Sequence, residues 1–537
     1  MAKITQKQTL ISGSHSSSEI SRREFFSRCG RCTALTAGSF FFNSSLHSLE
    51  KFTLFDFSNR TAKKEFNVRL LFALHRLVQN QPDWPNIGFN FTPVIEKYTE
   101  TLIKKLPSFN FLSSLSSGPE ETRKIILADT GNKIDGYVVF QLNCWNQVVQ
   151  PVVETGRPVL FVDFKFGGSG GFLVYTASFL RQQKSNLGFM ATSNFDDVIR
   201  AVKALEESKN PAGKASFSEI IRNIRLSRTA KPGYLDCYPD PLKFISASET
   251  IYRLKNSPIL LFRDAQGGDG FNLMGIPVLN LPFSELNQAW ENADREEAKE
   301  IAKKWWTGAA NVQGVRFSEI ENSAAMYLGM KALLKKYGAR AITINCLGGF
   351  YGGHIHAYPC LGFHELNNQG LVGGCEADIR STATMLAFSL MTQGRPGYIS
   401  DPVIDTAERH IIYAHCVAPN KVFGPNGPTN PYEILTHSED RQGASVRSIM
   451  PAGYLTTSMQ VDQRKQEILL HQAKTVGNSF DDRACRTKLV AEPLGDIEKL
   501  FTYWDEWGWH RVTFYGDLKK PAYELAEALG WKVIEEA

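Results

Sequence analysis

The feature that most constrains the fold is an alternation of strand-like and helix-like segments through the first two thirds of the chain. In the first series, apolar residues at helical spacing predict a helix at 66–80, which Pro82 ends. The rest of this series comprises expected strands at 124–128, 137–141 and 157–163 and an expected helix at 147–154. A second series comprises expected strands at 257–263, 276–281 and 341–346 and expected helices at 292–305 and 318–337. Such alternation is typical of βαβ units around a parallel sheet.

The domain organisation follows from the length of the chain and from a change of pattern near residue 419. A chain of 537 residues exceeds what one hydrophobic core usually organises. The last part comprises expected strands at 445–450, 454–461 and 511–515 and expected helices at 496–506 and 521–529. We therefore predict an α/β protein with two successive parallel-sheet α/β domains, 51–165 and 166–345. A C-terminal domain with an antiparallel β unit, 346–537, follows them.

The first fifty residues are predicted to be an export leader. Ser21-Arg22-Arg23-Glu24-Phe25-Phe26 matches the twin-arginine pattern, and a modest apolar run at 32–42 follows it. This predicts a periplasmic or otherwise exported protein, and the alternative is an extension whose paired arginines are incidental. The apolar run is too short to span a bilayer, so no stable membrane insertion is expected after processing. Cys29 and Cys32 have CxxC spacing, but they lie in the segment expected to be removed.

The charge distribution excludes nucleic acid as a partner. The formal net charge is +5, but the first fifty residues hold six Lys or Arg against three Asp or Glu. About +2 therefore remains for the rest of the chain. A surface that follows a phosphate backbone would show a regional excess of basic residues, which this sequence lacks.

A glycine-rich run, Lys165 to Gly171, follows the expected strand at 157–163. A phosphate-cradling loop occurs in this setting, but the run lacks both the lysine-containing P-loop pattern and GxGxxG spacing. We therefore favour a flexible or tight strand-to-helix turn over an anion site.

Residues 359–419 combine carboxylates, glycines, cysteines and histidines, and eight of the eleven histidines lie between His354 and His510. Glu376 follows two glycines and opens an expected helix at 375–392, where the helix dipole favours an ionised carboxylate. A turn at Pro396-Gly397 could bring Asp401 back beside Glu376, and Asp405 competes for this second role. Two carboxylates and an imidazole suit an octahedral divalent ion such as Mn²⁺ or Mg²⁺.

The same stretch resembles the L-fucose isomerase and L-arabinose isomerase superfamily, especially its fucose isomerase-like branch. The segments that carry the resemblance are Pro359-Cys360, Glu365-Leu366-Asn367, Gly374-Cys375-Glu376-Ala377-Asp378, Ala414-His415-Cys416, Pro419 and Trp509 to Gly516. The resemblance implies that Glu376, Asp401 and His510 bind the metal, with Mn²⁺ preferred and Mg²⁺ as the alternative. His415 is interpreted as a strand-end marker or a group behind the ligands.

The resemblance also implies a reaction: interconversion of an aldose and a ketose through a cis-enediol. In it, Glu376 and Asp401 would be catalytic and move the proton between adjacent carbons. A free sugar or deoxy sugar is the expected substrate, and a homo-oligomer, either a trimer or a hexamer, is the expected assembly. The alternatives are an exported carbohydrate-binding or sensory protein without turnover, and another metal-assisted sugar reaction such as epimerisation.

Overall fold

The structure, a computed structural model, describes residues 66–209 and 215–537. The predicted leader, with its twin-arginine motif, Cys29 and Cys32, lies outside the described residues, so export stays a prediction. Within the described ranges, no helix is both long enough and apolar enough to cross a membrane.

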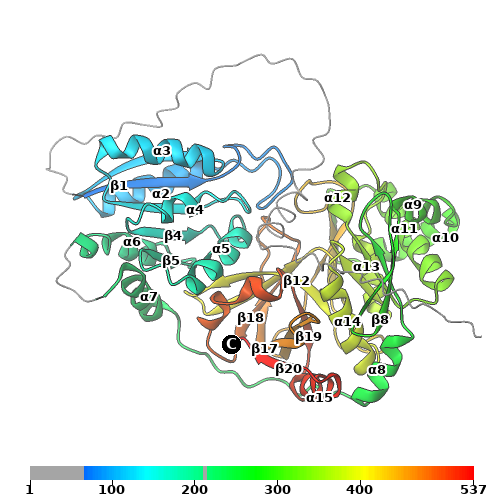
Figure 1. Cartoon of the computed structure of the whole chain (residues 1–537). Helices are drawn as coiled ribbons and strands as arrows, with labels where there is room; N and C mark the ends of the chain where they lie inside the picture. The colour runs from blue at the N-terminus through cyan, green and yellow to red at the C-terminus, as the bar shows by residue number, and fades with distance from the viewer. Residues whose placement is uncertain (1–65, 210–214) are drawn as a thin grey trace, which may run out of the picture. The chain divides into compact units, whose positions relative to one another are not determined.

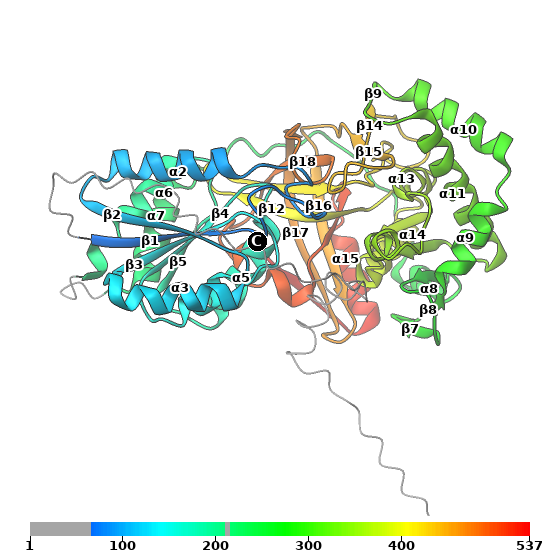
Figure 2. The same cartoon turned by 90° about the horizontal axis from the view of Figure 1, so that it is seen from above.

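The first α/β layer, by which we mean a sheet with the helices on both of its faces, contains a wholly parallel five-stranded sheet. The strand order in this sheet is β2-β1-β3-β4-β5. Its strands are β1 (Phe66–Ala73), β2 (Phe109–Ser116), β3 (Gly136–Gln141), β4 (Val159–Asp163) and β5 (Leu187–Met190). Its helices are α2 (Thr92–Lys105), α3 (Pro119–Asn132), α4 (Val149–Val153), α5 (Ser169–Arg181), α6 (Phe195–Lys203) and α7 (Phe217–Arg228). Figure 2 shows α2, α6 and α7 over one face and α3 and α5 over the other, which matches two separate apolar clusters.

Two of the predicted elements in this layer are wrong. The expected helix at 66–80 is the strand β1, and the expected strand at 124–128 lies inside α3. Both faces of β1 are buried, with Leu70 in one apolar cluster and Leu71 in the other. A strand buried on both faces has an almost continuous apolar sequence, which a helical spacing also fits.

The glycine-rich run forms the predicted turn from β4 into α5. The N–H groups of Gly167 and Gly168 both donate to Phe164 O, at 2.8 and 3.0 Å. A Cβ on Gly168 would lie 1.9 Å from Gln141 O, so the close approach of two backbones requires glycine here.

The second α/β layer has a mixed sheet of order β11-β10-β6-β8-β7, in which only the pairing of β7 with β8 is antiparallel. Its strands are β6 (Ile259–Phe262), β7 (Phe271–Leu273), β8 (Ile276–Leu281), β10 (Ala341–Ile344) and β11 (Val372–Cys375). Its helices are α8 (Ala247–Lys255), α9 (Phe283–Glu291), α10 (Arg295–Gly308), α11 (Phe317–Lys336), α12 (Cys346–Tyr351), α13 (Cys360–Asn368) and α14 (Ile379–Met391).

The C-terminal part is an antiparallel β-barrel, in which pairing runs β16-β19-β12-β13-β18-β17 and closes between β17 and β16. Its strands are β12 (Tyr398–Asp405), β13 (His410–His415), β16 (Leu455–Asp462), β17 (Glu467–Asn478), β18 (Thr487–Pro493) and β19 (Arg511–Tyr515). Four of these strands, β12, β17, β18 and β19, are labelled in Figure 1. The other elements here are α15 (Lys519–Leu529), β20 (Lys532–Glu535), and a small sheet of β9 (Asn311–Gln313), β14 (Tyr432–Leu435) and β15 (Ser445–Ser448). The expected helix at 496–506 is replaced by two 3₁₀ turns, Lys499–Phe501 and Trp504–Trp507.

The predicted fold class is confirmed: two α/β layers precede a C-terminal antiparallel unit. The domain boundaries at 165 and 345 stay predictions. The sheets themselves extend beyond both positions, because β5 ends at Met190 and β11 at Cys375.

A buried ion cluster holds the C-terminus against the barrel. Glu536 accepts hydrogen bonds from Arg511 Nε at 3.0 Å and Nη2 at 2.9 Å, and its Oε1 lies 2.7 Å from His471 Nδ1. Burial alone would raise the pKa of Glu536, but the charge of Arg511, followed by His471, lowers it to about 2.

We expect Glu536→Gln to destabilise the protein by about 3 kcal/mol, because it leaves Arg511 buried without its anion. The ionised Glu536 contributes stability above its unfolded pKa of 4.5, and this contribution is lost as the pH falls toward 2. Urea unfolding from pH 7 to pH 3 measures both effects. Glu527→Gln, at an exposed position on α15, is the control and should leave the midpoint unchanged.

Candidate metal centre

The register of the barrel strands brings His510 beside Asp401. β12 and β19 are antiparallel, with Tyr398 opposite Thr513 and Ser400 opposite Arg511. One further step along each strand places Asp401 opposite His510. Two residues separated by more than a hundred positions in the sequence therefore meet through main-chain pairing.

Glu376 reaches the same place from the end of β11. Close packing requires the glycines before it, since a Cβ on Gly374 would lie 2.3 Å from Thr382 Oγ1. Glu376 does not open the helix as expected, because α14 begins at Ile379 and Asp378 is its N-cap. Glu376 and Ala377 instead have left-handed φ angles of 60° and 52°, which turn the chain sharply between strand and helix.

His510 lies close to both of the carboxylates predicted from the sequence. His510 Nε2 lies 3.1 Å from Asp401 Oδ1 and 3.5 Å from Glu376 Oε2. His415, at the end of β13, approaches from another side, with its Nε2 3.7 Å from Glu376 Oε1. Both histidines are buried, and neither Nε2 atom has a hydrogen-bond partner.

The two histidines differ in the atoms bonded to Nδ1. His510 Nδ1 lies 2.9 Å from Asp378 Oδ2, so the proton of a neutral ring lies on Nδ1 and Nε2 presents a lone pair. In contrast, the main-chain N–H of Cys416 donates to His415 Nδ1 at 3.0 Å, which leaves the proton of a neutral ring on Nε2. His510 therefore suits a metal ligand, and His415 suits a donor to an oxygen atom in the site.

The neighbouring charges shift the pKa values of these groups in different directions. Burial, with repulsion from Asp401 adding to it, raises the pKa of Glu376 above its usual range. Burial would also raise the pKa of Asp401, but the close approach of His510 lowers it. Burial opposes the charge on His510, yet Asp378 and Asp401 together raise the pKa of His510 well above its usual range.

Asp405, the alternative second carboxylate, is engaged elsewhere. Its Oδ2 lies 2.6 Å from Lys165 Nζ, and its Oδ1 accepts a hydrogen bond from Ser193 N at 3.0 Å. This arrangement favours Asp401 for the role that the sequence left open between the two.

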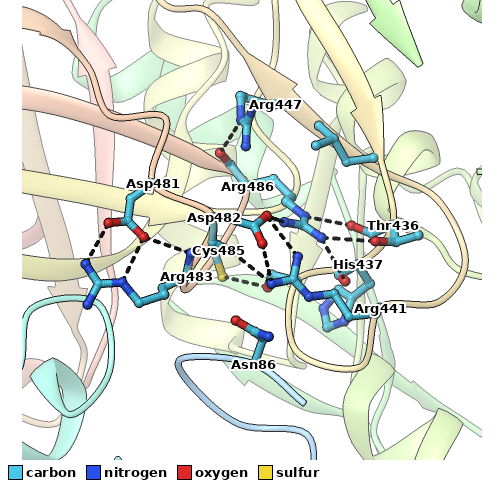
Figure 3. Close-up of polar contacts among 12 residues, drawn as sticks. Asn86, Thr436, His437, Arg441, Arg447, Asp481, Asp482, Arg483, Cys485 and Arg486 are labelled. Carbon is cyan, nitrogen blue, oxygen red and sulfur yellow. Dashed lines mark hydrogen bonds and ion pairs between the residues drawn. The ribbon is translucent and has the colours of Figure 1, made fainter. Parts of the chain in front are cut away.

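The loop between β17 and β18 adds contacts to Asp401, and Figure 3 shows how arginines fix this loop. Arg486 donates to Thr436 O at 2.8 Å, and its Nη1 donates to Asp482 Oδ1 at 2.8 Å. The adjacent Cys485 places its Sγ 3.7 Å from Asp401 Oδ2. Asp401 is also oriented by Trp509 Nε1, which donates to its Oδ1 at 2.6 Å.

The sequence singled out Glu376, Asp401 and His510 but not the residues that contact them. Asp378, the N-cap of α14, orients His510. His415 lies within the cluster instead of behind it. Trp509 directly precedes His510, and no motif in the sequence indicated that its indole bonds Asp401.

The donor types suit a divalent metal ion, and their separations define two groups. In the part of the chain that the structure describes, the groups whose ligand atoms all lie within 4.8 Å of one another are Asp401, His415 and His510, and Cys375, Glu376 and His415. His510 Nε2, 3.1 Å from Asp401 Oδ1 and 3.5 Å from Glu376 Oε2, links the two groups. The unpartnered Nε2 atom, two carboxylates and an Asp–His pair behind the ligand match this chemistry. That Glu376, Asp401 and His510 bind a metal stays a prediction.

The fold and the centre together define an α/β protein with a C-terminal barrel and a candidate metal site. Comparison with known proteins then shows which class of enzyme the chain is similar to. The chain is distantly similar to sugar isomerases, which supports the coarser part of the family prediction. Sulfoquinovose isomerases from Priestia aryabhattai and from Priestia megaterium (strain ATCC 12872 / QMB1551) are each 20% identical to it over 337 residues. These matches cover 60% of this chain and 69% of each relative. No protein-family model matches the chain.

We expect Asp378→Asn to weaken Mn²⁺ binding by about 10- to 100-fold while the fold persists. Asparagine still caps α14, but it no longer holds the proton on His510 Nδ1 as a carboxylate does. Calorimetric titration with Mn²⁺ measures the effect. Asp294→Asn replaces the N-cap of α10 in the same way and is the matched control. Equal affinities for both variants would contradict the orienting role of Asp378.

Proposed function

We propose that this protein is a metal-dependent aldose–ketose isomerase that acts on a free sugar or deoxy sugar. Glu376, Asp401 and His510 would hold Mn²⁺, or alternatively Mg²⁺. The observation that carries the proposal is that the buried His510 Nε2 lies 3.1 Å from Asp401 Oδ1 and 3.5 Å from Glu376 Oε2. The distant similarity to sulfoquinovose isomerases supports the reaction class.

In the proposed reaction, the bound ion would stabilise negative charge on two adjacent sugar oxygens. Glu376 would accept a proton from one carbon of the sugar and return it to the next. Asp401 stays ionised, held by Trp509 and His510. His415 Nε2–H would donate to a sugar oxygen and orient the substrate for this transfer.

The substrate proposal covers neutral and sulfonated aldoses. Sulfoquinovose belongs in the first panel because the two relatives are named for it, and fucose and arabinose belong there because of the motif resemblance. Ketose formation with any of them would support isomerisation. Sugar binding without turnover would support the carbohydrate-binding alternative instead.

We expect Glu376→Gln to reduce kcat by at least about 100-fold, because glutamine cannot carry the proton. The test measures ketose formation by the purified full-length protein with Mn²⁺, together with thermal unfolding to show that the fold is intact. Glu408→Gln, at an exposed position before β13, is the control and should retain activity. An unchanged turnover number for Glu376→Gln would rule out this role of Glu376.

We also propose that the leader directs export through the twin-arginine route, and that the protein forms a trimer or hexamer. Replacing Arg22 and Arg23 by lysine keeps the charge but removes the paired guanidinium groups. We expect the double variant to stay in the cytoplasmic fraction, whereas the unchanged chain reaches the periplasmic fraction. Equal distribution of both would contradict the route.

A further inference from the structure

A group of buried free thiols has no part in the proposed chemistry, although the sulfur of one member, Cys375, lies within 4.8 Å of ligand atoms of Glu376 and His415. Its members are Cys346, Cys360, Cys375, Cys416 and Cys485. Two of them stand out because the Sγ atoms of Cys346 and Cys375 are only 3.3 Å apart. Both side chains are buried, and Cys375 directly precedes Glu376.

The backbone around these two cysteines is suited to a covalent link. β10 and β11 are parallel neighbours with Ile344 opposite Cys375, and Cys346 follows Ile344 by two residues at the start of α12. The N–H of Ala377 donates to Ile344 O at 3.0 Å, which holds the two segments together just beyond the pair. A disulfide has an S–S length of about 2.05 Å, so the sulfurs need to approach by only about 1.3 Å.

We propose that Cys346 and Cys375 form a reversible disulfide, and that its formation weakens metal binding at the neighbouring centre. The oxidant is a peroxide: one thiol sulfur attacks a peroxide oxygen, the O–O bond breaks, and a sulfenic acid and one water result. The second thiol then attacks the sulfenic sulfur, the S–S bond forms, and a second water leaves. Two thiols thus lose two electrons and two protons to one hydrogen peroxide, and a dithiol reductant reverses the change.

The effect on the metal follows from the short connection between Cys375 and Glu376. Ligand atoms in a metal site tolerate displacements of about 0.2 Å, which is small beside the approach that the sulfurs must make. Glu376 lies in a tight left-handed turn, so a shift of Cys375 passes directly to its carboxylate. This second half of the inference rests on the proposed function, whereas the disulfide itself does not.

The first experiment looks for the bond in the full-length protein. Reduced protein is treated with hydrogen peroxide, remaining thiols are alkylated, and the chain is cut with trypsin and a glutamate-specific protease. In the Cys360→Ser variant, peptide 341–365 then carries only Cys346 and peptide 366–376 only Cys375. We expect these two peptides to be linked after oxidation and separate after reduction. Two separate peptides after oxidation would overturn the proposal.

The second experiment measures Mn²⁺ affinity by calorimetry before oxidation, after oxidation and after re-reduction. We expect a loss of at least tenfold on oxidation, recovery on reduction, and no redox dependence in Cys346→Ser. Cys237→Ser, which removes a partly exposed thiol in a connecting segment, should keep the redox response of the unchanged protein.

The outcomes separate the two proposals. A linked peptide with unchanged Mn²⁺ affinity, or an equal loss of affinity in Cys346→Ser, would overturn the control of the centre by this pair. Absence of Mn²⁺ binding in the reduced protein would overturn the proposed metal centre, while the disulfide would still be judged by the peptide result.

Discussion

The pairing of β12 with β19 is the constraint on which the candidate centre depends. The paired residues run from Tyr398 opposite Thr513 to Ser400 opposite Arg511, so Asp401 and His510, the next residue on each side, lie close together at the end of the pairing. Closure of the barrel limits the freedom of these strands to slip, and a slip of β19 by one residue would turn His510 to the other face while Asp401 stayed in place. Glu376 meets them from the second sheet, so the centre lies where β11 and the barrel meet.

The negative charges of the centre favour binding of a cation. Glu376, Asp378 and Asp401 are carboxylates around one buried imidazole, and burying such charges without a partner is costly. Burial opposes a charge on His510, but hydrogen bonds to Asp378 and Asp401 and the charge of Asp401 raise the pKa of His510 well above its usual range. A divalent ion bound here would supply more positive charge and would leave the Asp378 contact on Nδ1 intact. A proton and a metal would therefore compete for Nε2, and the Asp–His pair would suit both states.

The sequence predicts the fold class better than it predicts single elements. It also indicates the polar residues of the candidate site better than the residues that contact them. The strands β4 and β10 are bounded by turn residues and were predicted as strands. In contrast, β1 is buried on both faces, and its nearly continuous apolar sequence led to the prediction of a helix. The motif resemblance pointed to Glu376, Asp401 and His510. The roles of Asp378 and Trp509 depend on a left-handed turn after Glu376 and on the orientation of an indole, and neither leaves a periodic signal. The tautomers of His415 and His510 depend on contacts to Nδ1 that only the folded chain defines.

The strand end and turn at Cys375 and Glu376 explain why the thiol pair lies so close to the candidate metal centre. Two successive non-glycine residues in the left-handed region cost on the order of 1 kcal/mol or more each. The hydrogen bonds from Ala377 N to Ile344 O and from Asp378 N to Cys375 O hold the chain in this conformation. A straight continuation of β11 into α14 would carry the carboxylate away from His510, so the strain is tied to the placement of Glu376. The pairing of β11 with β10 places Cys375 opposite Ile344, and this keeps Cys375 close to Cys346. The position of the carboxylate and the separation of the two sulfurs are therefore two consequences of one backbone geometry.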